Sequence, residues 1–223
     1  MQKFDTTSPI TAVLDIPAGR IQFIAADRTD TTVEILPADK SKSRDMKAAE
    51  QTTAAYADGV LRIETATAKT RLLGNSGSIE VTVQLPAGSR IEAKTAAAEL
   101  RGVGRLGNVT FESAQGTVKV DETASARVTL QAGSVLIGRL SGPAQISTQK
   151  GDLNITEATG GTVELRTESG DITINATRGT SATLDAGTTY GRIHNTLQNT
   201  EGATASLNIQ ATTAHGDITA RSL

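Results

Sequence analysis

The sequence predicts an all-β protein whose larger part is a single-stranded parallel β-helix, that is, a solenoid of short stacked strands. Glycine recurs about every twenty residues through the second half of the chain, which is a period typical of solenoids. A short strand with alternating apolar residues follows each of these glycines. The 223 residues include three Phe, two Tyr and no Trp, and they are rich in Thr, Val and Ile. Such small and β-branched side chains fit the narrow core of stacked strands.

Residues 1–85 are expected to form a β-rich cap region with one short helix at about 43–57. From Met46 to Tyr56 the periodic residues fall at steps of three and four, as on one face of a helix. Gly59 follows the last of them and is the expected C-cap residue of this helix. Alternating apolar residues predict short strands around the helix, at 10–16, 21–24, 33–36 and 60–63.

Residues 79–85 alternate more regularly than any other segment and predict a strand. This strand ends at a Pro-Ala-Gly sequence at 86–88, which repeats the Pro-Ala-Gly sequence at 17–19. In both places an apolar strand is expected to end at a turn, with a new strand beginning at Ile21 or Ile91.

Residues 86–223 are expected to form the solenoid, continuous with the cap region in one domain. Each repeat contains two strands, and we call such a pair a rung. A glycine is expected at the sharp turn between the two strands of a rung, because the chain needs a positive φ there. These turn glycines are Gly116, Gly133, Gly151, Gly170, Gly191 and Gly216.

The inward-facing residues of each strand are separated by one residue, so that both point to the same side. In the first strands they are Val109/Phe111, Val128/Leu130, Ala144/Ile146, Val163/Leu165, Ala182/Leu184 and Leu207/Ile209. In the second strands they are Val118/Val120, Val135/Ile137, Leu153/Ile155, Ile172/Ile174, Ile193 and Ile218/Ala220. One rung cannot bury its apolar face alone, so stacking must supply the core. Right-handed crossovers are the rule for parallel strands, which favours a right-handed helix. An antiparallel meander is the alternative, because a period alone does not determine strand direction.

The turn sequences resemble those of a known family. They are Gln115-Gly-Thr-Val-Lys-Val, Lys150-Gly-Asp-Leu-Asn-Ile, Ser169-Gly-Asp-Ile-Thr-Ile and His215-Gly-Asp-Ile-Thr. Together with Leu85-Pro-Ala-Gly-Ser and Phe4-Asp-Thr, they resemble the DUF4097/DUF2807 family of bacterial β-strand-repeat proteins described as "putative adhesin". The resemblance covers nearly the whole chain and implies a parallel β-helix. Its motifs concern architecture and imply very little chemistry.

Composition argues against several classes of function. The formal net charge is −2 with both signs interspersed, so no basic face for nucleic acid is expected. The chain has no cysteine, and its two histidines, His194 and His215, have no partner at the spacing of a metal site or a catalytic pair. We therefore expect no enzyme, no metal and no cofactor. No signal peptide or membrane segment is apparent, which predicts a cytoplasmic protein.

The position after each turn glycine forms a column that contains Asp152, Asp171, Arg192 and Asp217. Stacked in register, Asp152 and Asp171 would lie about 4.8 Å apart at the backbone. Carboxylates this close can act as an acid–base pair, so a carbohydrate-active enzyme is one alternative. The favoured interpretation is turn chemistry, in which each Asp side chain binds nearby backbone N–H groups. Arg192, placed between Asp171 and Asp217, would then complete a charge ladder.

The favoured function is that of a non-catalytic scaffold that self-associates or binds a protein partner. Tyr190, Arg192 and His215 are expected to gather at the C-terminal rungs as a small recognition surface. The last strand, from Ile218 to Leu223, is expected to leave the end of the solenoid exposed, where a partner or another copy binds end to end. A cell-surface adhesin is the main alternative.

Overall fold

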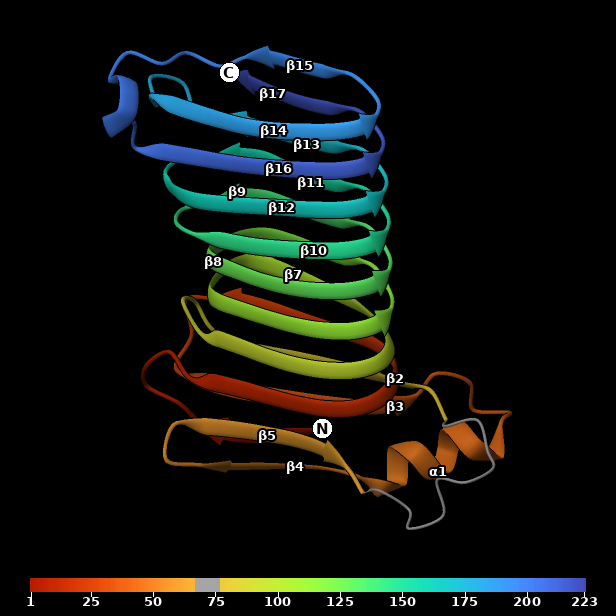
Figure 1. The fold of residues 1–223 in the computed structure, drawn as a ribbon. Helices are drawn as coiled ribbons and strands as arrows, with labels where there is room; N and C mark the ends of the chain where they lie inside the picture. Colours follow the sequence, from red (N-terminus) through yellow and green to blue (C-terminus); the bar gives the residue numbers. More distant parts are fainter. Residues whose placement is uncertain (67–76) are drawn as a thin grey trace.

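The computed structural model describes residues 1–66 and 77–223, which form a stack of coils beside a small cap region that contains a helix (Figure 1). In the cap region and the lower part of the stack the strands are β1 (Gln2–Asp5), β2 (Thr11–Ala26), β3 (Asp30–Pro37), β4 (Thr52–Ala57), β5 (Val60–Thr65), β6 (Ile79–Pro86), β7 (Arg90–Gln115) and β8 (Val118–Ala132). In the upper part they are β9 (Val135–Leu140), β10 (Ala144–Lys150), β11 (Leu153–Ala158), β12 (Gly161–Ser169), β13 (Ile172–Ala176), β14 (Ala182–Tyr190), β15 (Ile193–Thr196), β16 (Leu207–His215) and β17 (Ile218–Ser222). The described helices are α1 (Ser43–Gln51) and the 3₁₀-helix η1 (Gly202–Thr204).

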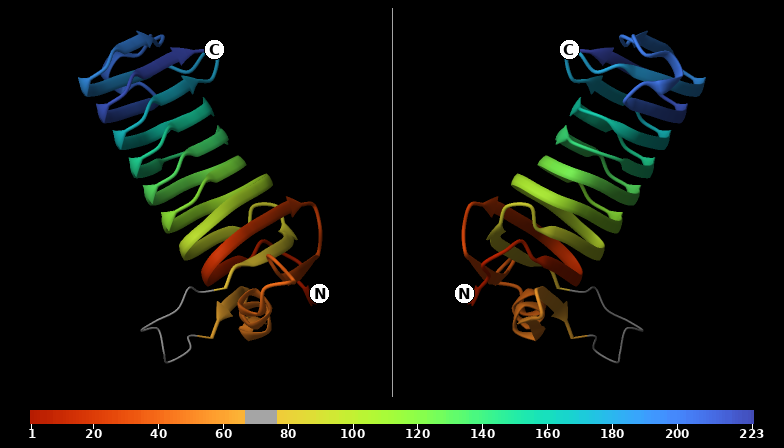
Figure 2. Two further views of the ribbon diagram at one scale, coloured as in Figure 1. Left: turned by 90° about the vertical axis from the view of Figure 1, so that its right-hand side faces the viewer. Right: turned by 90° about the vertical axis from the view of Figure 1, so that its left-hand side faces the viewer.

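From β7 onward the strands pair in parallel, first strand on first strand and second strand on second strand. The two views of Figure 2 show the resulting ladder of coils from its edges. The all-β, solenoid-like fold predicted from the sequence is confirmed. An antiparallel meander is wrong for this part of the chain.

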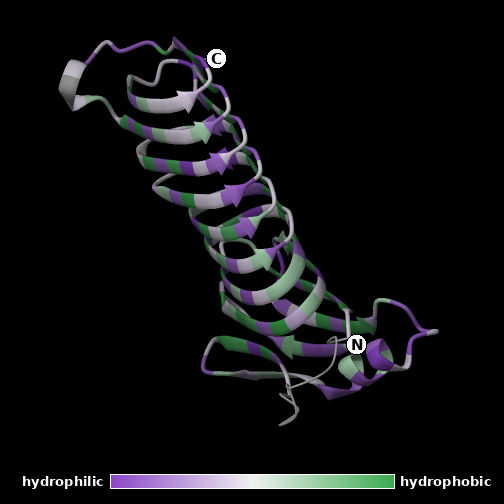
Figure 3. Cartoon of the chain, turned by 45° about the vertical axis from the view of Figure 1, so that its right-hand side comes forward, coloured by the Kyte–Doolittle hydropathy of each residue, from purple (hydrophilic) through white to green (hydrophobic). Residues whose placement is uncertain are grey.

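The parallel register builds the core from columns of like side chains. In the second strands Val118, Val135, Leu153 and Ile172 lie one above another, and each is no more than 2% exposed. Hydrophobic and hydrophilic residues alternate along the strands of the stack, as the colours of Figure 3 show, and β11 is one example of the resulting burial pattern. The residues expected to face inward in these second strands therefore form continuous columns. In the first strands Val128 and Leu130 are both buried, and Val128 continues the column above Phe111.

The turn glycines are required by the distance between rungs. At Gly151 φ is +145°, and a Cβ atom there would lie 2.2 Å from the carbonyl oxygen of Gly133 in the rung below. Both the backbone conformation and the contact exclude an L side chain. The short period of the stack thus depends on glycine at this turn.

The rungs at the C-terminal end do not stack in the order of the sequence. β16 lies between β12 and β14, and β17 lies between β13 and β15 (Figure 1). The outermost rung is therefore β14–β15. The sequence prediction that the last strand forms the exposed end is wrong, since Ile218 is fully buried between Ile172 and Ile193.

The inward-facing residues explain this order. β17 places Ile218 and Ala220 inward, whereas β15 places Ile193 and Asn195 at the same positions. A polar side chain is costly inside the core and tolerated at an open end. Asn195 is exposed, and its side-chain oxygen accepts a 3.0 Å hydrogen bond from the N–H of Leu197. The rung that carries Asn195 is therefore the one suited to the outside.

The cap region is built from antiparallel pairs, of which β3 with β6 and β4 with β5 are the longest. The predicted helix over 43–57 is only partly correct, because α1 ends at Gln51 and β4 follows at once. The turn between β4 and β5 is Asp58–Gly59, with φ values of 51° and 77°. An Asp-Gly pair with two positive φ values is a preferred hairpin turn, so Gly59 closes a hairpin and does not cap a helix.

β2 belongs to the stack, although it lies within the predicted cap. It pairs in parallel with β7 over residues 11–24. The two Pro-Ala-Gly sequences have different roles, since Gly19 forms a bend inside β2 and Gly88 ends the turn between β6 and β7. The domain boundary expected at residue 85 therefore remains a proposal.

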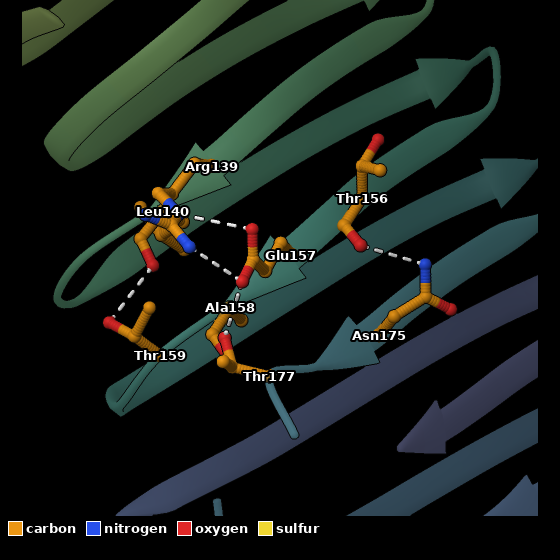
Figure 4. Close-up of polar contacts among 8 residues, drawn as sticks. All are labelled: Arg139, Leu140, Thr156, Glu157, Ala158, Thr159, Asn175 and Thr177. Carbon is orange, nitrogen blue, oxygen red and sulfur yellow. Dashed lines mark hydrogen bonds and ion pairs between the residues drawn. The ribbon is translucent and has the colours of Figure 1, made fainter. Parts of the chain in front are cut away.

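Polar side chains join the second strands of successive rungs (Figure 4). Arg139 donates two hydrogen bonds to Glu157, at 2.7 and 3.0 Å, and the hydroxyl of Thr177 donates to the same carboxylate at 3.2 Å. These contacts hold the pKa of Glu157 below its ordinary value. Asn175, which is 4% exposed, donates to the carbonyl oxygen of Thr156 at 2.9 Å. Each contact links neighbouring rungs.

Candidate functional site

The turn of the outermost rung, between β14 and β15, brings together three of the residues predicted to recognise a partner. Tyr190 is the last residue of β14 and Arg192 lies in the turn after it, while His215, the last residue of β16, lies beneath Tyr190. Asp217 completes the group beneath Arg192. We call these four residues the end cluster.

The rings of Tyr190 and His215 are stacked, with 4.9 Å between their centroids and 14° between their planes. Tyr190 is 68% exposed. Since His215 occupies the side of the ring toward the stack, the other face of the Tyr190 ring is turned to the open end. A rigid aromatic ring with one free face is a favourable element of a binding surface.

Arg192 and Asp217 form the charged half of the end cluster. Asp217 accepts hydrogen bonds from the backbone N–H of Arg192, at 2.8 Å, and from its guanidinium, at 2.9 Å. These two bonds, the backbone bond first, lower the pKa of Asp217. The Arg192 side chain is nevertheless 89% exposed, so its charge is available at the end of the stack.

The aspartates after the turn glycines bind backbone, as the favoured interpretation predicted. Asp152 accepts from the N–H of Asp171 at 2.9 Å, and Asp171 accepts from the N–H of Asp217 at 2.7 Å. Each side chain thus supports the turn of the next rung. Arg192 does not lie between Asp171 and Asp217 as predicted, because the rungs stack out of order. It lies beyond Asp217 and ends the ladder.

Threonine three residues before the turn glycine is a feature that the sequence reasoning missed. Thr167 and Thr213 are buried, and each hydroxyl donates at 3.1 Å to the carbonyl oxygen of the turn glycine one rung below, Gly151 or Gly170. Thr148 and Thr188 make the same bond at 3.3 and 3.0 Å. The signal in the sequence is the recurring Thr-x-x-Gly pattern.

The open end also carries the free edges of two strands. Within the described residues β14 pairs only with β16, and β15 pairs only with β17. Ile193 points inward from β15 but is 46% exposed because no rung covers it. The end therefore combines unpaired backbone, apolar surface and the end cluster.

The other two residues predicted to recognise a partner lie elsewhere. Ile218 is inside the core, so its side chain cannot contact another molecule. Leu223 is 51% exposed but lies beyond the far end of β17, where its N–H donates to the carbonyl oxygen of Ala176 at 3.0 Å. It is not part of the end cluster.

The described residues give little support for a metal site, a membrane-spanning helix or an aromatic-lined ligand pocket. Residues 1–66 and 77–223 contain no group of three His, Asp or Glu residues placed to hold a metal ion. No described helix has the length and apolar character needed to cross a bilayer. Two open grooves of ≈390 and ≈370 Å³ share Arg90 and Asn108 on the side of the stack, and no aromatic side chain lines them.

Comparison with solved structures finds similar proteins at low sequence identity. A "putative adhesin" from Parabacteroides distasonis ATCC 8503 has 11% identity and a TM-score of 0.51, with 98% of this chain and 95% of that chain covered. A "putative adhesin" from Bacteroides fragilis NCTC 9343 has 12% identity and a TM-score of 0.45, with 100% and 95% covered. A "putative cell adhesion protein" from Clostridium sporogenes ATCC 15579 has 11% identity and a TM-score of 0.42, with 100% and 98% covered. Comparison with curated proteins finds no match.

The cytoplasmic location predicted from the sequence is contradicted by these comparisons. The similar structure from Parabacteroides distasonis is described as a "putative adhesin", and adhesion takes place at the cell surface. The sequence itself matches a known family over residues 12–221, a range that runs from the first coil to the end of β17. This chain belongs to the family described as Toastrack DUF4097.

Proposed function

We propose that the chain is a non-catalytic interaction module of the cell surface, which binds a protein partner or another copy of itself through the open end of its stack. The observation that carries the proposal is the end cluster. It places an exposed aromatic ring and an exposed guanidinium beside edges of β14 and β15 on which the described residues place no further strand. The similar structure from Parabacteroides distasonis is described as a "putative adhesin", which supports a surface location.

The end of the stack is better suited to binding than its sides. The sides carry exposed ion pairs between neighbouring rungs, such as Lys94 with Glu112 at 3.4 Å, which are typical of a solvated face. A free strand edge offers N–H and C=O groups to another chain unless it is protected by Lys, Pro or a bulge. β14 contains neither Lys nor Pro. An added strand at this edge would form main-chain hydrogen bonds, a known mode of protein recognition.

Catalysis by Asp152 and Asp171 has less support. Each carboxylate already accepts a hydrogen bond from a backbone N–H of the next rung. This role accounts for their presence after the turn glycines without any reaction. We further propose a right-handed coil, in which the parts of residues 1–85 outside β2 act as the cap of the solenoid.

Adhesion of displayed protein tests the proposed function. The chain is displayed on a bacterium that does not adhere, and binding to a panel of cultured cells and clumping of the displaying bacteria are both counted. The native chain should cause cell binding or clumping. Tyr190→Ala combined with Arg192→Ala should abolish that effect. Lys94→Ala combined with Glu112→Ala, on the side of the stack, is the matched control and should leave it intact. Equal adhesion by both double variants would contradict the proposal.

A further inference from the structure

We infer that the open end accepts one further rung from another polypeptide, an extended segment parallel to β14 with the turn sequence Thr-x-x-Gly-Asp or Thr-x-x-Gly-Glu. The inference rests on the proposed function, because it specifies the partner of the same surface. Each part of this sequence follows from a contact that already repeats between the rungs of the stack.

The backbone of the outermost turn is arranged to receive another turn. In the rungs below, the N–H of Gly216 donates to the carbonyl oxygen of Tyr190 at 3.0 Å, and the N–H of Ile218 donates to that of Arg192 at 2.9 Å. The N–H groups of Gly191 and Ile193 occupy the equivalent positions one rung further out, where the described part of the chain places no strand. Two carbonyl groups of an added parallel turn would satisfy them.

Glycine is required at the turn of the added rung. A Cβ atom at Gly216 would lie 2.0 Å from the carbonyl oxygen of Gly170, and one at Gly191 would lie 1.9 Å from that of Gly216. The same contact would arise between an added rung and the carbonyl oxygen of Gly191. Any other residue at this position would force the added turn away from the stack.

Threonine and an acidic residue follow from the same repetition. Thr188 and Thr213 each donate a hydroxyl hydrogen bond to the turn glycine below, so a threonine in the added rung would reach the carbonyl oxygen of Gly191. The residue after the added glycine would lie above Arg192. Since the guanidinium there is 89% exposed and bound to Asp217 on its inner side, an acidic residue would pair with its outer side.

Apolar residues of the added rung would complete the core at this end. Ile193 is 46% exposed although it occupies the column that contains the buried Ile218 and Ile172. Leu184 is half-buried at the end of the corresponding column of first strands. An apolar residue directly after the acidic one would cover Ile193, as Ile218 covers Ile172. Area removed from water in this way favours binding.

A peptide that copies residues 207–222 provides the probe, because it contains Thr213, Gly216, Asp217 and Ile218 in the required order. The fluorescently labelled peptide is titrated with the full chain, and anisotropy gives the affinity. Gly216→Ala in the peptide should weaken binding by about tenfold or more, and Thr213→Val by about fivefold. Amide hydrogen exchange of the protein should slow at Gly191 and Ile193 when the peptide is bound.

The acidic residue is tested by a double-mutant cycle between peptide and protein. Asp217→Asn in the peptide should weaken binding to the native chain and change binding to the Arg192→Ala chain much less. Lys150→Ala, in an interior turn, is the matched control and should leave every affinity unchanged. Absence of binding, equal affinity of the Gly216→Ala peptide, or protection at a site other than the outermost turn would overturn the inference.

The peptide and adhesion experiments fail separately. If the Tyr190→Ala and Arg192→Ala double variant loses adhesion and the peptide does not bind, the proposed function stands and the added rung is wrong. If the peptide binds as described and the double variant adheres normally, the added rung stands and adhesion through this end is wrong.

Discussion

The ring of Tyr190 stacks on that of His215, with their centroids 4.9 Å apart, although Tyr190 belongs to the earlier rung in the sequence and the outer rung in space. This contact exists because β16 and β17 occupy the layer beneath β14 and β15. Rung order thus decides that Tyr190 and Arg192 face the open end while His215 and Asp217 lie beneath them, and several predictions depend on that order.

The first prediction concerns the column that contains Ala220 and Asn195. Ala220→Asn should lower the free energy of unfolding by about 3 kcal/mol, because it places an amide without partners in the core. Asn195→Ala, one rung further out in the same column, should change it by less than about 1 kcal/mol because that position is exposed. Urea unfolding measures both values. The opposite ranking would show that the rungs stack in the order of the sequence.

A second prediction concerns the turn glycines. Gly151→Ala should lower the free energy of unfolding by more than about 3 kcal/mol, because φ is +145° and the Cβ atom would lie 2.2 Å from a carbonyl oxygen. Gly187→Ala is the control, since a Cβ atom at Gly187 meets nothing within 4 Å. Thermal unfolding should separate the two variants clearly. Similar melting temperatures would mean that the turns tolerate side chains.

A third prediction tests the buried threonine hydroxyls. Thr167→Val keeps the shape of the side chain and removes the 3.1 Å hydrogen bond to the carbonyl oxygen of Gly151. The loss should be about 1 to 2 kcal/mol, because the carbonyl group is left without this donor. Thr173→Val, at an outward-facing position of β13, should be close to neutral. Denaturant unfolding of both variants measures the difference, and a neutral Thr167→Val would refute the structural role of the hydroxyl.

A fourth prediction concerns acid. The side-chain hydrogen bond from Arg28, followed by that from Lys3, lowers the pKa of Asp30 from 3.8 to about 2. The folded state therefore binds this proton more weakly than the unfolded state. Asp30 then contributes stability above pH 3.8, and the contribution is lost as the pH falls toward about 2.

NMR titration of the Asp30 carboxyl checks this directly. Arg28→Ala should raise the pKa of Asp30 toward its ordinary value and reduce the loss of stability in acid. Arg192→Ala should likewise raise the pKa of Asp217, whose lowering depends on the backbone and side chain of Arg192. Arg20→Ala, whose ion pairs are with Glu80 and Glu99, should change neither. An unchanged Asp30 in the Arg28→Ala variant would contradict the assignment.

Much of the fold could be predicted from local patterns. The inward column from Val118 to Ile172 is readable because strands alternate with a period of two and a glycine marks each turn. The helix was predicted too long because Tyr56 continues a helical spacing while it also alternates in β4, and pairing with β5 decided between the two. Periodicity over a few residues does not resolve that choice.

The end cluster was predicted in part. Tyr190, Arg192 and His215 could be grouped because they flank turn glycines, and this holds for either order of the last two rungs. The burial of Ile218 depends on which rung lies outside, and that order is a non-local property. The polar residue Asn195 at an inward position was the available signal.

The position of β16 against β12 also affects how the protein can fold. As the chain emerges from N to C, β14 exists before β16 and meets the vacant edge of β12. Any pairing formed there must be undone, because that edge belongs to β16 in the finished protein. A repeat protein can otherwise grow by simple zippering from one end. We therefore expect the final two rungs to assemble together, in a step late in folding that is slower than the addition of the lower rungs.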